Sequence, residues 1–345
     1  MEMKIKNSKR INLLNPSIII PAVALIILLL IPKLISGYFL HTVILILMYA
    51  TLGAAWNWLG GFAGQISLAH AVFFGLGSYV NACCQIWFGI NPWVAMVISM
   101  IIVGVFSVLI GIPCFRLKGH YFAIATIALG EIIKTIFVNW PAAGGAIGLY
   151  IPIKDISLKN FQFYSKIPYY YIILMMYILS TIITIWIKNS RNGYYFRAIK
   201  EDPEASKALG IDLVKTKLLA MWLSGVMCAM VGSFYVNYVL YIDPEGSFLF
   251  MNSVKIALIA VMGGMGSVFG PIIGSIIIIL LSEGSRIYLG GMGAGLDFVI
   301  YGLLIMIIAV YQPGGIVGAF NSYTKKRKKA KRQIVNQGIQ NDSIA

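Results

Sequence analysis

The stretch "FRAIKEDPEASKALGID", from Phe196 to Asp212, is a densely charged segment within an otherwise apolar chain. It contains four of the twelve aspartate and glutamate residues of the protein. The whole chain is 59% hydrophobic and 11% charged, whereas soluble domains carry about 25% charged residues. This composition predicts an integral membrane protein in which the charged stretch lies outside the lipid bilayer.

The apolar runs on both sides of this stretch are long enough to be membrane spans, since a transmembrane helix needs about 20 apolar residues. We predict an all-α integral membrane protein, a polytopic bundle of about ten transmembrane helices. The eighth run is short, so it is either a half-helix or a re-entrant segment. The predicted spans are 18–36, 40–59, 66–88, 92–114, 121–139, 168–187, 217–240, 251–265, 267–289 and 296–312.

The lysines and arginines predict the orientation of these spans. If both termini are cytosolic, the inner side holds 20 of the 27 basic residues, which is the bias expected of cytoplasmic loops. The protein then lies in the plasma (inner) membrane. It divides into a cytosolic N-terminal segment (1–17), a transmembrane domain (18–312) with a cytosolic loop at 188–216, and a basic cytosolic tail (313–345).

The net charge of +15 does not by itself indicate a nucleic-acid partner. Part of it lies in "KKRKKAKR", Lys325 to Arg332, which lacks the aromatic platform or folded reader that nucleic-acid recognition uses. A basic cluster close to the last span favours contact with anionic lipid headgroups. We therefore expect membrane lipid, and no nucleic acid, as a partner.

The charged stretch contains the signals of a short helix that is capped at both ends. Asp202 suits the N-cap, Pro203 the first helical position, and Glu204 the positive end of the helix dipole. Lys207 lies near the other end, and Gly210 suits the left-handed residue after the last turn. About two turns of helix are unstable alone in water. The segment is therefore either a solvated connector or, as we favour, a docking element for a cytosolic partner.

Two glycine-rich segments interrupt the spans, "GGFAG" from Gly60 and "GGMGSVFGPIIG" from Gly263. Glycines at small-xxx-small spacing let helices approach closely, and broken helices at membrane depth line a cavity or are buried in protein. The sequence leaves close helix packing and helix breaks equally open. The glycines concerned are Gly60, Gly61, Gly64, Gly263, Gly264, Gly266 and Gly270.

Polar residues inside the spans are the candidates for a translocation path. Glu131 lies near the middle of its span, where a carboxylate costs at least ~2.5 kcal/mol. We therefore expect it to face the bundle interior and to pair with Lys134, three residues on. This pair belongs either to a proton or substrate path or, more conservatively, to a structural contact. Gln65, Ser67 and His70 either line a path or satisfy backbone groups that the nearby glycines leave free.

The sequence offers no pattern for an active site. It contains neither an H-E-x-x-H zinc motif nor a G-x-x-x-x-G-K-[ST] phosphate loop. The four cysteines lie within apolar runs, at spacings that suit neither a metal site nor a disulfide framework. We expect no metal, no cofactor and no enzymatic activity, so the energy for transport would come from a cytosolic partner.

Four blocks of this sequence resemble the permease subunits of ABC importers for branched-chain amino acids, of the LivM type. The resemblance extends from about residue 40 to residue 318, and it is most specific in the charged loop and in the first glycine segment. The blocks are "GGFAGQISLAHAVFFGLGSY" from Gly60, "FRLKGHYFAIATIALGEIIK" from Phe115, "YYFRAIKEDPEASKALGIDLVKTKLLA" from Tyr194 and "MGGMGSVFGPIIG" from Met262.

The resemblance implies three kinds of partner: a second homologous permease subunit, two cytosolic ABC ATPase subunits and an extracytoplasmic substrate-binding protein. It also implies that ATP is hydrolysed on the ATPase subunits and that the charged loop couples them to the bundle. The coupling residues would be Glu201, Asp202, Pro203, Glu204, Ala205, Lys207, Ala208, Leu209 and Gly210. Two alternatives are a permease for urea or short amides in the same family, and a proton-coupled secondary transporter that uses Glu131.

Overall fold

The computed structural model describes residues 27–35, 37–117 and 119–289, together with 299, 302, 303, 306 and 315–318. Residues 27–34 form a helix inside the first predicted span. The predicted N-terminal segment lies outside the described residues. So do most of the last predicted span and most of the basic tail.

The described chain is predominantly helical, which confirms the predicted all-α polytopic fold. Seven helical segments in this part of the chain are long and apolar enough to cross a membrane. The helices are α2 (Gly37–Trp56), the π-helix η1 (Asn57–Phe62), α3 (His70–Phe88), α4 (Pro92–Cys114), α5 (His120–Val138), the 3-10 turns η2 (Pro141–Ala143) and η3 (Gly145–Ile147), α6 (Ile167–Asn189), α7 (Arg191–Glu201), α8 (Pro203–Ala208), α9 (Leu213–Val239), α10 (Pro244–Ser247), α11 (Phe250–Gly263) and α12 (Gly270–Leu289).

Capping residues explain where several spans begin. The predicted span 92–114 coincides with α4, because the Asn91 side chain accepts a hydrogen bond from the backbone N–H of Trp93 (2.9 Å). α9 begins before the predicted residue 217, since Asp212 accepts from the backbone N–H of Lys215 (3.1 Å). This hydrogen bond holds the pKa of Asp212 below its ordinary value. Hydropathy alone misses the polar first turn of α9.

The short eighth span consists of two helical pieces. α11 has 14 residues and is about 21 Å long, less than the ~30 Å of a bilayer core. α10 precedes it, separated by Phe248 and Leu249. Together the two pieces cover 20 residues. This span is therefore a divided helix, which differs from both expected forms, a half-helix and a re-entrant segment.

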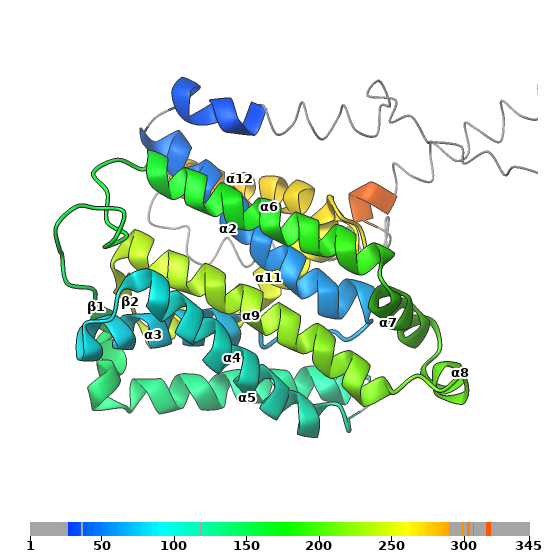
Figure 1. Ribbon diagram of the computed structural model, residues 1–345. Coiled ribbons are helices and arrows are strands. Elements are labelled where there is room, and N and C mark those ends of the chain that lie inside the picture. The colour runs from blue at the N-terminus through cyan, green and yellow to red at the C-terminus, as the bar shows by residue number, and fades with distance from the viewer. Residues whose placement is uncertain are drawn as a thin grey trace, which may run out of the picture.

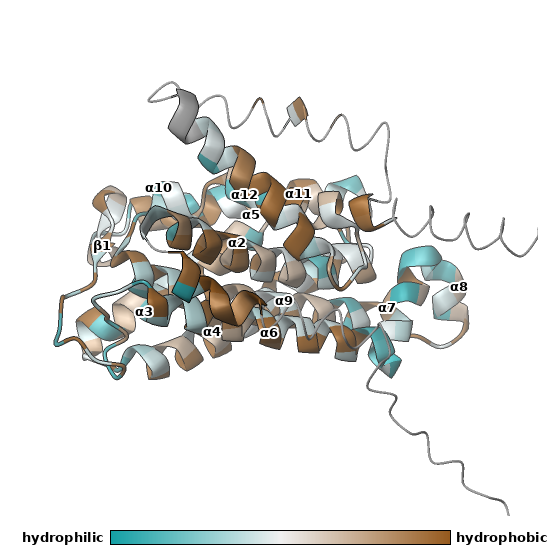
Figure 2. Ribbon diagram, turned by 90° about the horizontal axis from the view of Figure 1, so that it is seen from above, coloured by the Kyte–Doolittle hydropathy of each residue, from teal (hydrophilic) through white to brown (hydrophobic). Residues whose placement is uncertain are grey.

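α9 runs through the bundle beside α3 and α4, while α2 packs against α6, α11 and α12 (Figure 1). α3 and α9 touch through their backbones. A methyl group added at Gly77 would collide with the backbone of Ala229, and one at Gly232 would collide with the carbonyl of Phe74. This is the close approach that small residues permit between membrane helices. Figure 2 shows hydrophobic residues along the long helices and hydrophilic residues on α7 and α8.

A buried amide cluster joins α3 to α9. Gln85 Nε2 donates to Asn81 Oδ1 (2.7 Å) and to Asn237 Oδ1 (2.9 Å). Asn237 Nδ2 donates in turn to Asn81 Oδ1 (2.9 Å). All three side chains are buried. Because they satisfy one another, they fix the pairing of the two helices rather than lining a path.

A small two-stranded sheet is the exception to the all-α fold. β1 (Leu149–Tyr150) pairs antiparallel with β2 (Tyr241–Ile242). It joins the loop between α5 and α6 to the end of α9, and it lies at the opposite end of the bundle from α8 (Figure 1). We call these two ends the sheet end and the α8 end.

Candidate coupling and translocation site

The start of α8 has the predicted cap. Asp202 Oδ1 accepts hydrogen bonds from the backbone N–H groups of Glu204 (2.9 Å) and Ala205 (3.0 Å). Pro203 occupies the first helical position. This geometry satisfies two of the N–H groups that a helix start leaves free. The helix therefore has a fixed first turn despite its six residues.

The end of α8 is fixed as well. Gly210 has a φ of +82°, and its backbone N–H donates to the carbonyl of Lys207 (3.0 Å). The N–H of Ile211 donates to the carbonyl of Ser206 (3.1 Å). These two bonds form a Schellman motif, which favours glycine at the left-handed position. The predicted left-handed position of Gly210 after the last turn is confirmed.

α8 projects from the bundle with most of its surface uncovered. Of residues 201–210, Ser206 is buried and the others are exposed. Leu209 is 81% exposed, and Ala205 and Ala208 are exposed beside it. α8 thus has a fixed conformation and exposes apolar side chains to solvent. These two features favour a docking element over a solvated connector.

α7 ties this loop to the membrane helices. Ser190 caps its start, and Phe196 and Ile199 are buried. Lys200, near its end, donates from Nζ to the carbonyl oxygen of Gly61 (2.9 Å). The charged loop is thus connected by a direct hydrogen bond to the first glycine segment. No local sequence pattern indicates this contact.

The two glycine segments meet at Asn57 in η1. Asn57 Oδ1 accepts from the backbone N–H of Gly266 (2.7 Å), and its Nδ2 donates to the carbonyl of Ser267 (2.9 Å). Asn57 is fully buried, and it lies in a π-helix, a form often found at functional sites. One side chain therefore holds both segments together.

Both interpretations of the glycines hold. Residues 63–69 and 264–269 are not helical, so each segment is a helix break. The glycines also allow close packing, because a methyl group at Gly61 would collide with Asn57 and with the backbone of Gly266. Similar collisions affect other predicted positions: Gly60 with Trp56, Gly64 with Lys200, Gly263 with Gly270, and Gly270 with Ser267; Gly264 and Gly266 have positive φ.

Gln65 and Ser67 lie within the first break, and His70 is the first residue of α3 after it. The carbonyl of Ser67 accepts from Trp56 Nε1 (2.8 Å), and His70 Nε2 lies 2.7 Å from Ser224 Oγ on α9. Ser67 and His70 are fully buried, whereas Gln65 is partly exposed. Ser67 Oγ also accepts from the backbone N–H of Ala69 (3.3 Å), so Ser67 satisfies a backbone group of the break, whereas His70 bonds another side chain.

Glu131 lies on an exposed face of α5. Its carboxylate is 2.5 Å from Lys134 Nζ, and its side chain is 48% exposed. The pairing with Lys134 is confirmed, but the expectation that Glu131 faces the interior of this bundle is wrong. The reason is that α5 buries few residues against the rest of the chain, namely Phe122, Thr126 and Phe137.

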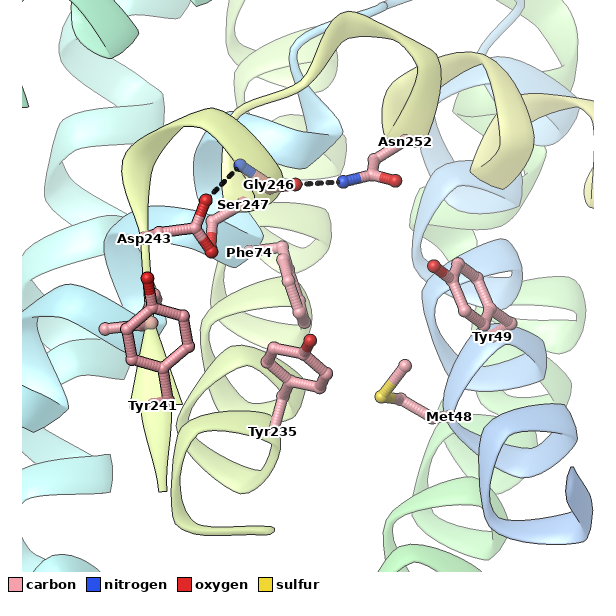
Figure 3. Close-up of a pocket in the computed structure, with 10 residues that line it drawn as sticks. Met48, Tyr49, Phe74, Tyr235, Tyr241, Asp243, Gly246, Ser247 and Asn252 are labelled. Carbon is pink, nitrogen blue, oxygen red and sulfur yellow. Dashed lines mark hydrogen bonds between the residues drawn. The ribbon is translucent and has the colours of Figure 1, made fainter. Parts of the chain in front are cut away.

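A half-open cavity of about 180 Å³ lies at the sheet end, and we call it the sheet-end pocket (Figure 3). Its residues come from the helices α2, α3, α9, α10 and α11 and from the strand β2, so no local sequence pattern groups them. One signal was available: Asp243-Pro244-Glu245 repeats the pattern of Asp202-Pro203-Glu204 and starts α10 in the same way. Residues that line the pocket include Met48, Tyr49, Phe74, Tyr235, Asp243 and Asn252.

A second cavity, of about 410 Å³, lies beside the second glycine segment. Lys188, at the end of α6, is the charged residue among those that line it. The other walls are mainly backbone and apolar side chains, including Gly264, Gly266, Ser267, Phe269 and Val317. This cavity adjoins the segment that Asn57 anchors.

A bundle of membrane-crossing helices, with an exposed capped helix at one end and broken helices inside, is the architecture of a polytopic transport permease. The chain belongs to the family described as "Branched-chain amino acid transport system / permease component", whose model matches residues 38–310.

Individual relatives are similar over most of the chain. The high-affinity branched-chain amino acid transport system permease protein LivM of Escherichia coli (strain K12) is 25% identical, over 83% of this chain and 71% of the relative. The permease protein LivH of the same system and strain is 26% identical, over 78% and 91%. The fructose import permease protein FrcC of Rhizobium meliloti is 27% identical over a shorter part, 43% and 42%. No solved structure matches the chain.

Proposed function

We propose that the chain is the membrane-spanning permease subunit of an ATP-driven importer for branched-chain amino acids. The observation that carries the proposal is α8, an exposed helix capped at both ends, in a chain of this family. In this proposal the α8 end and both termini face the cytosol. The sheet end faces an extracytoplasmic substrate-binding protein.

Two cytosolic ATPase subunits dock on α8 and hydrolyse the ATP. Asp202, Pro203 and Gly210 fix the shape of the helix, whose exposed residues form the contact surface. Glu201, Glu204 and Lys207 supply polar contacts, and Ala205, Ala208 and Leu209 supply apolar ones. Movement of α8 reaches the membrane through α7, because Lys200 bonds Gly61 and Asn57 joins the two glycine segments.

The translocation path runs along the exposed face of α5, between this chain and a second homologous permease. Glu131 and Lys134 lie on that face, where lipid contact would be costly for charged groups. Gln65, which is partly exposed, is a further path residue. Ser67 and His70 stabilise the broken helix next to Gln65.

Uptake measurements in a strain that lacks only this subunit test the proposal. The wild-type chain should restore uptake of radiolabelled leucine, and a chain without residues 202–210 should not, although it still inserts in the membrane. Leu209→Asp should lose co-purification with the ATPase subunits. Leu158→Asp, an equally apolar exposed position in the loop between α5 and α6 (65% exposed), should retain it. Normal uptake by the deletion variant would rule out the coupling role.

The two alternatives make different predictions in the same strain. A proton-coupled transporter would lose leucine uptake when a protonophore is added while ATP stays high. In such a transporter, Glu131→Gln would abolish the response of uptake to the protonophore. A permease for urea or short amides would import labelled urea or acetamide and leave leucine outside. The presence of an exposed, capped α8 favours the ATP-driven importer over the first alternative.

A further inference from the structure

The sheet-end pocket brings a carboxylate together with aromatic rings (Figure 3). Asp243 lies on one side, and the rings of Phe74 and Tyr235 stand next to each other with centroids 5.2 Å apart. Met48 and Tyr49 of α2 form the facing wall. Residues of the helices α2, α3, α9, α10 and α11 and of the strand β2 thus build a cavity of mixed acidic and apolar character.

This combination of groups suits a small ammonium compound. Carboxylates and the faces of aromatic rings are the groups that attract an organic cation. Asp243 Oδ2 already accepts from the backbone N–H of Gly246 (2.6 Å), but a carboxylate has about four acceptor sites. Met48 and Phe74 offer apolar surface to the remainder of the ligand.

A positive charge lies next to the facing wall. Lys255 Nζ of α11 is 4.4 Å from the centroid of the Tyr49 ring. The pocket therefore has a negative side at Asp243 and a positive neighbour beyond Tyr49. The lining itself, with Asp243 and aromatic rings, matches the ammonium group of an amino acid better than an uncharged sugar.

The volume limits the size of the ligand. The pocket has about 180 Å³, while an apolar cavity of about 150 Å³ takes up benzene and most ligand pockets hold ~300–1,000 Å³. An amino group with a short branched chain is compatible with this space. A nucleotide or an oligosaccharide is not.

We propose that the sheet-end pocket is a receiving site for the transported amino acid, with Asp243 binding its ammonium group. The inference rests on the proposed function, which places the sheet end outside the cell. It assigns a binding site within this single chain, separate from the α5 face. Asp243 would then have two roles: its side chain caps the start of α10 and its carboxylate binds the ammonium group of the ligand.

Binding is tested on the full-length chain in complex with its partner permease, by ligand-induced shifts of the thermal unfolding midpoint. Leucine and isopentylamine should each raise the midpoint in a saturable way, and N-acetylleucine, which has no ammonium group, should not. Asp243→Asn should weaken leucine binding about tenfold, since a charge-assisted hydrogen bond is lost. Asparagine caps helices as well as aspartate does, so the fold should be kept.

Glu245→Gln is the matched control, because Glu245 is an exposed carboxylate of the same helix α10 that does not line the pocket. It should leave binding unchanged. If Asp243→Asn does not insert in the membrane, Asp243→Ser, which also preserves the cap, gives the same comparison.

The outcomes separate the two proposals. If the wild-type complex imports no leucine, the proposed function fails, whatever the binding data. If the wild type imports leucine and Asp243→Asn binds it with unchanged affinity, the receiving site is overturned and the importer stands. Equal binding of leucine and N-acetylleucine would overturn the receiving site as well.

Discussion

Asn237 serves two amide partners at once, since its Oδ1 accepts from Gln85 and its Nδ2 donates to Asn81. Asn237→Ala removes both bonds inside a buried cluster, where neither partner can turn to water. We expect the free energy of unfolding to fall by about 1–2 kcal/mol. Thermal unfolding of the purified chain in detergent measures the change.

The control is an asparagine on the surface. Asn139→Ala removes an exposed side chain whose Nδ2 bonds a carbonyl of its own helix (2.8 Å), so stability should stay within about 0.5 kcal/mol. Asn81→Ala combined with Asn237→Ala should cost less than the sum of the single changes, because both act on one network. Full additivity would contradict a shared cluster.

At the scale of elements, Lys200 is the link between the charged loop and the broken helices. Lys200→Met removes the hydrogen bond to Gly61 while keeping the apolar stem that packs near Gly64. α8 keeps its own caps, so the ATPase subunits should still co-purify. We expect leucine uptake to fall severalfold without a matching loss of ATP hydrolysis. Reconstituted vesicles allow both rates to be measured on one preparation.

Lys215→Met tests whether the effect is specific to this bond. Lys215 belongs to the same loop region and is 86% exposed, and its ammonium pairs locally with Asp212 (3.2 Å). Its loss should leave uptake close to that of the wild type. An equal fall of uptake in both variants would show that loop charge, rather than the bond to Gly61, matters.

These elements also show what the sequence could predict. The caps of α8 were predictable because Asp202, Pro203 and Gly210 act on groups within a few residues. The start of α4 is likewise marked by neighbouring residues, Asn91 at the cap and Pro92 at the first helical position, although the span was predicted from its apolar run alone. The bond of Lys200 to Gly61 joins positions 139 apart, and no local pattern encodes it. The sheet-end pocket was not predicted for the same reason, although Asp243-Pro244 marks the start of α10.

At the scale of the whole molecule, the proposed second permease would account for the exposed placement of Glu131. A carboxylate at membrane depth is costly in lipid, which predicts an interior position if this bundle alone has to shelter Glu131. α5 is the least buried of the seven membrane-crossing helices in the described residues, and Glu131 lies on its open face. The charge would then be sheltered by a second subunit rather than by this bundle.

This assignment predicts a cross-link. Ile132, next to Glu131, is 58% exposed on α5, and Ile101 is 61% exposed on α4. Ile132→Cys should cross-link to a cysteine scanned along the second permease, and Ile101→Cys, similarly exposed on α4 but outside the proposed α5 interface, should not. Cys83 is partly exposed and is replaced by serine in both variants. The cross-link is expected because charged groups in lipid are costly, so a second subunit should cover this face. If Ile132→Cys cross-links nowhere along the second permease, the Glu131–Lys134 pair tolerates lipid and the translocation path lies elsewhere.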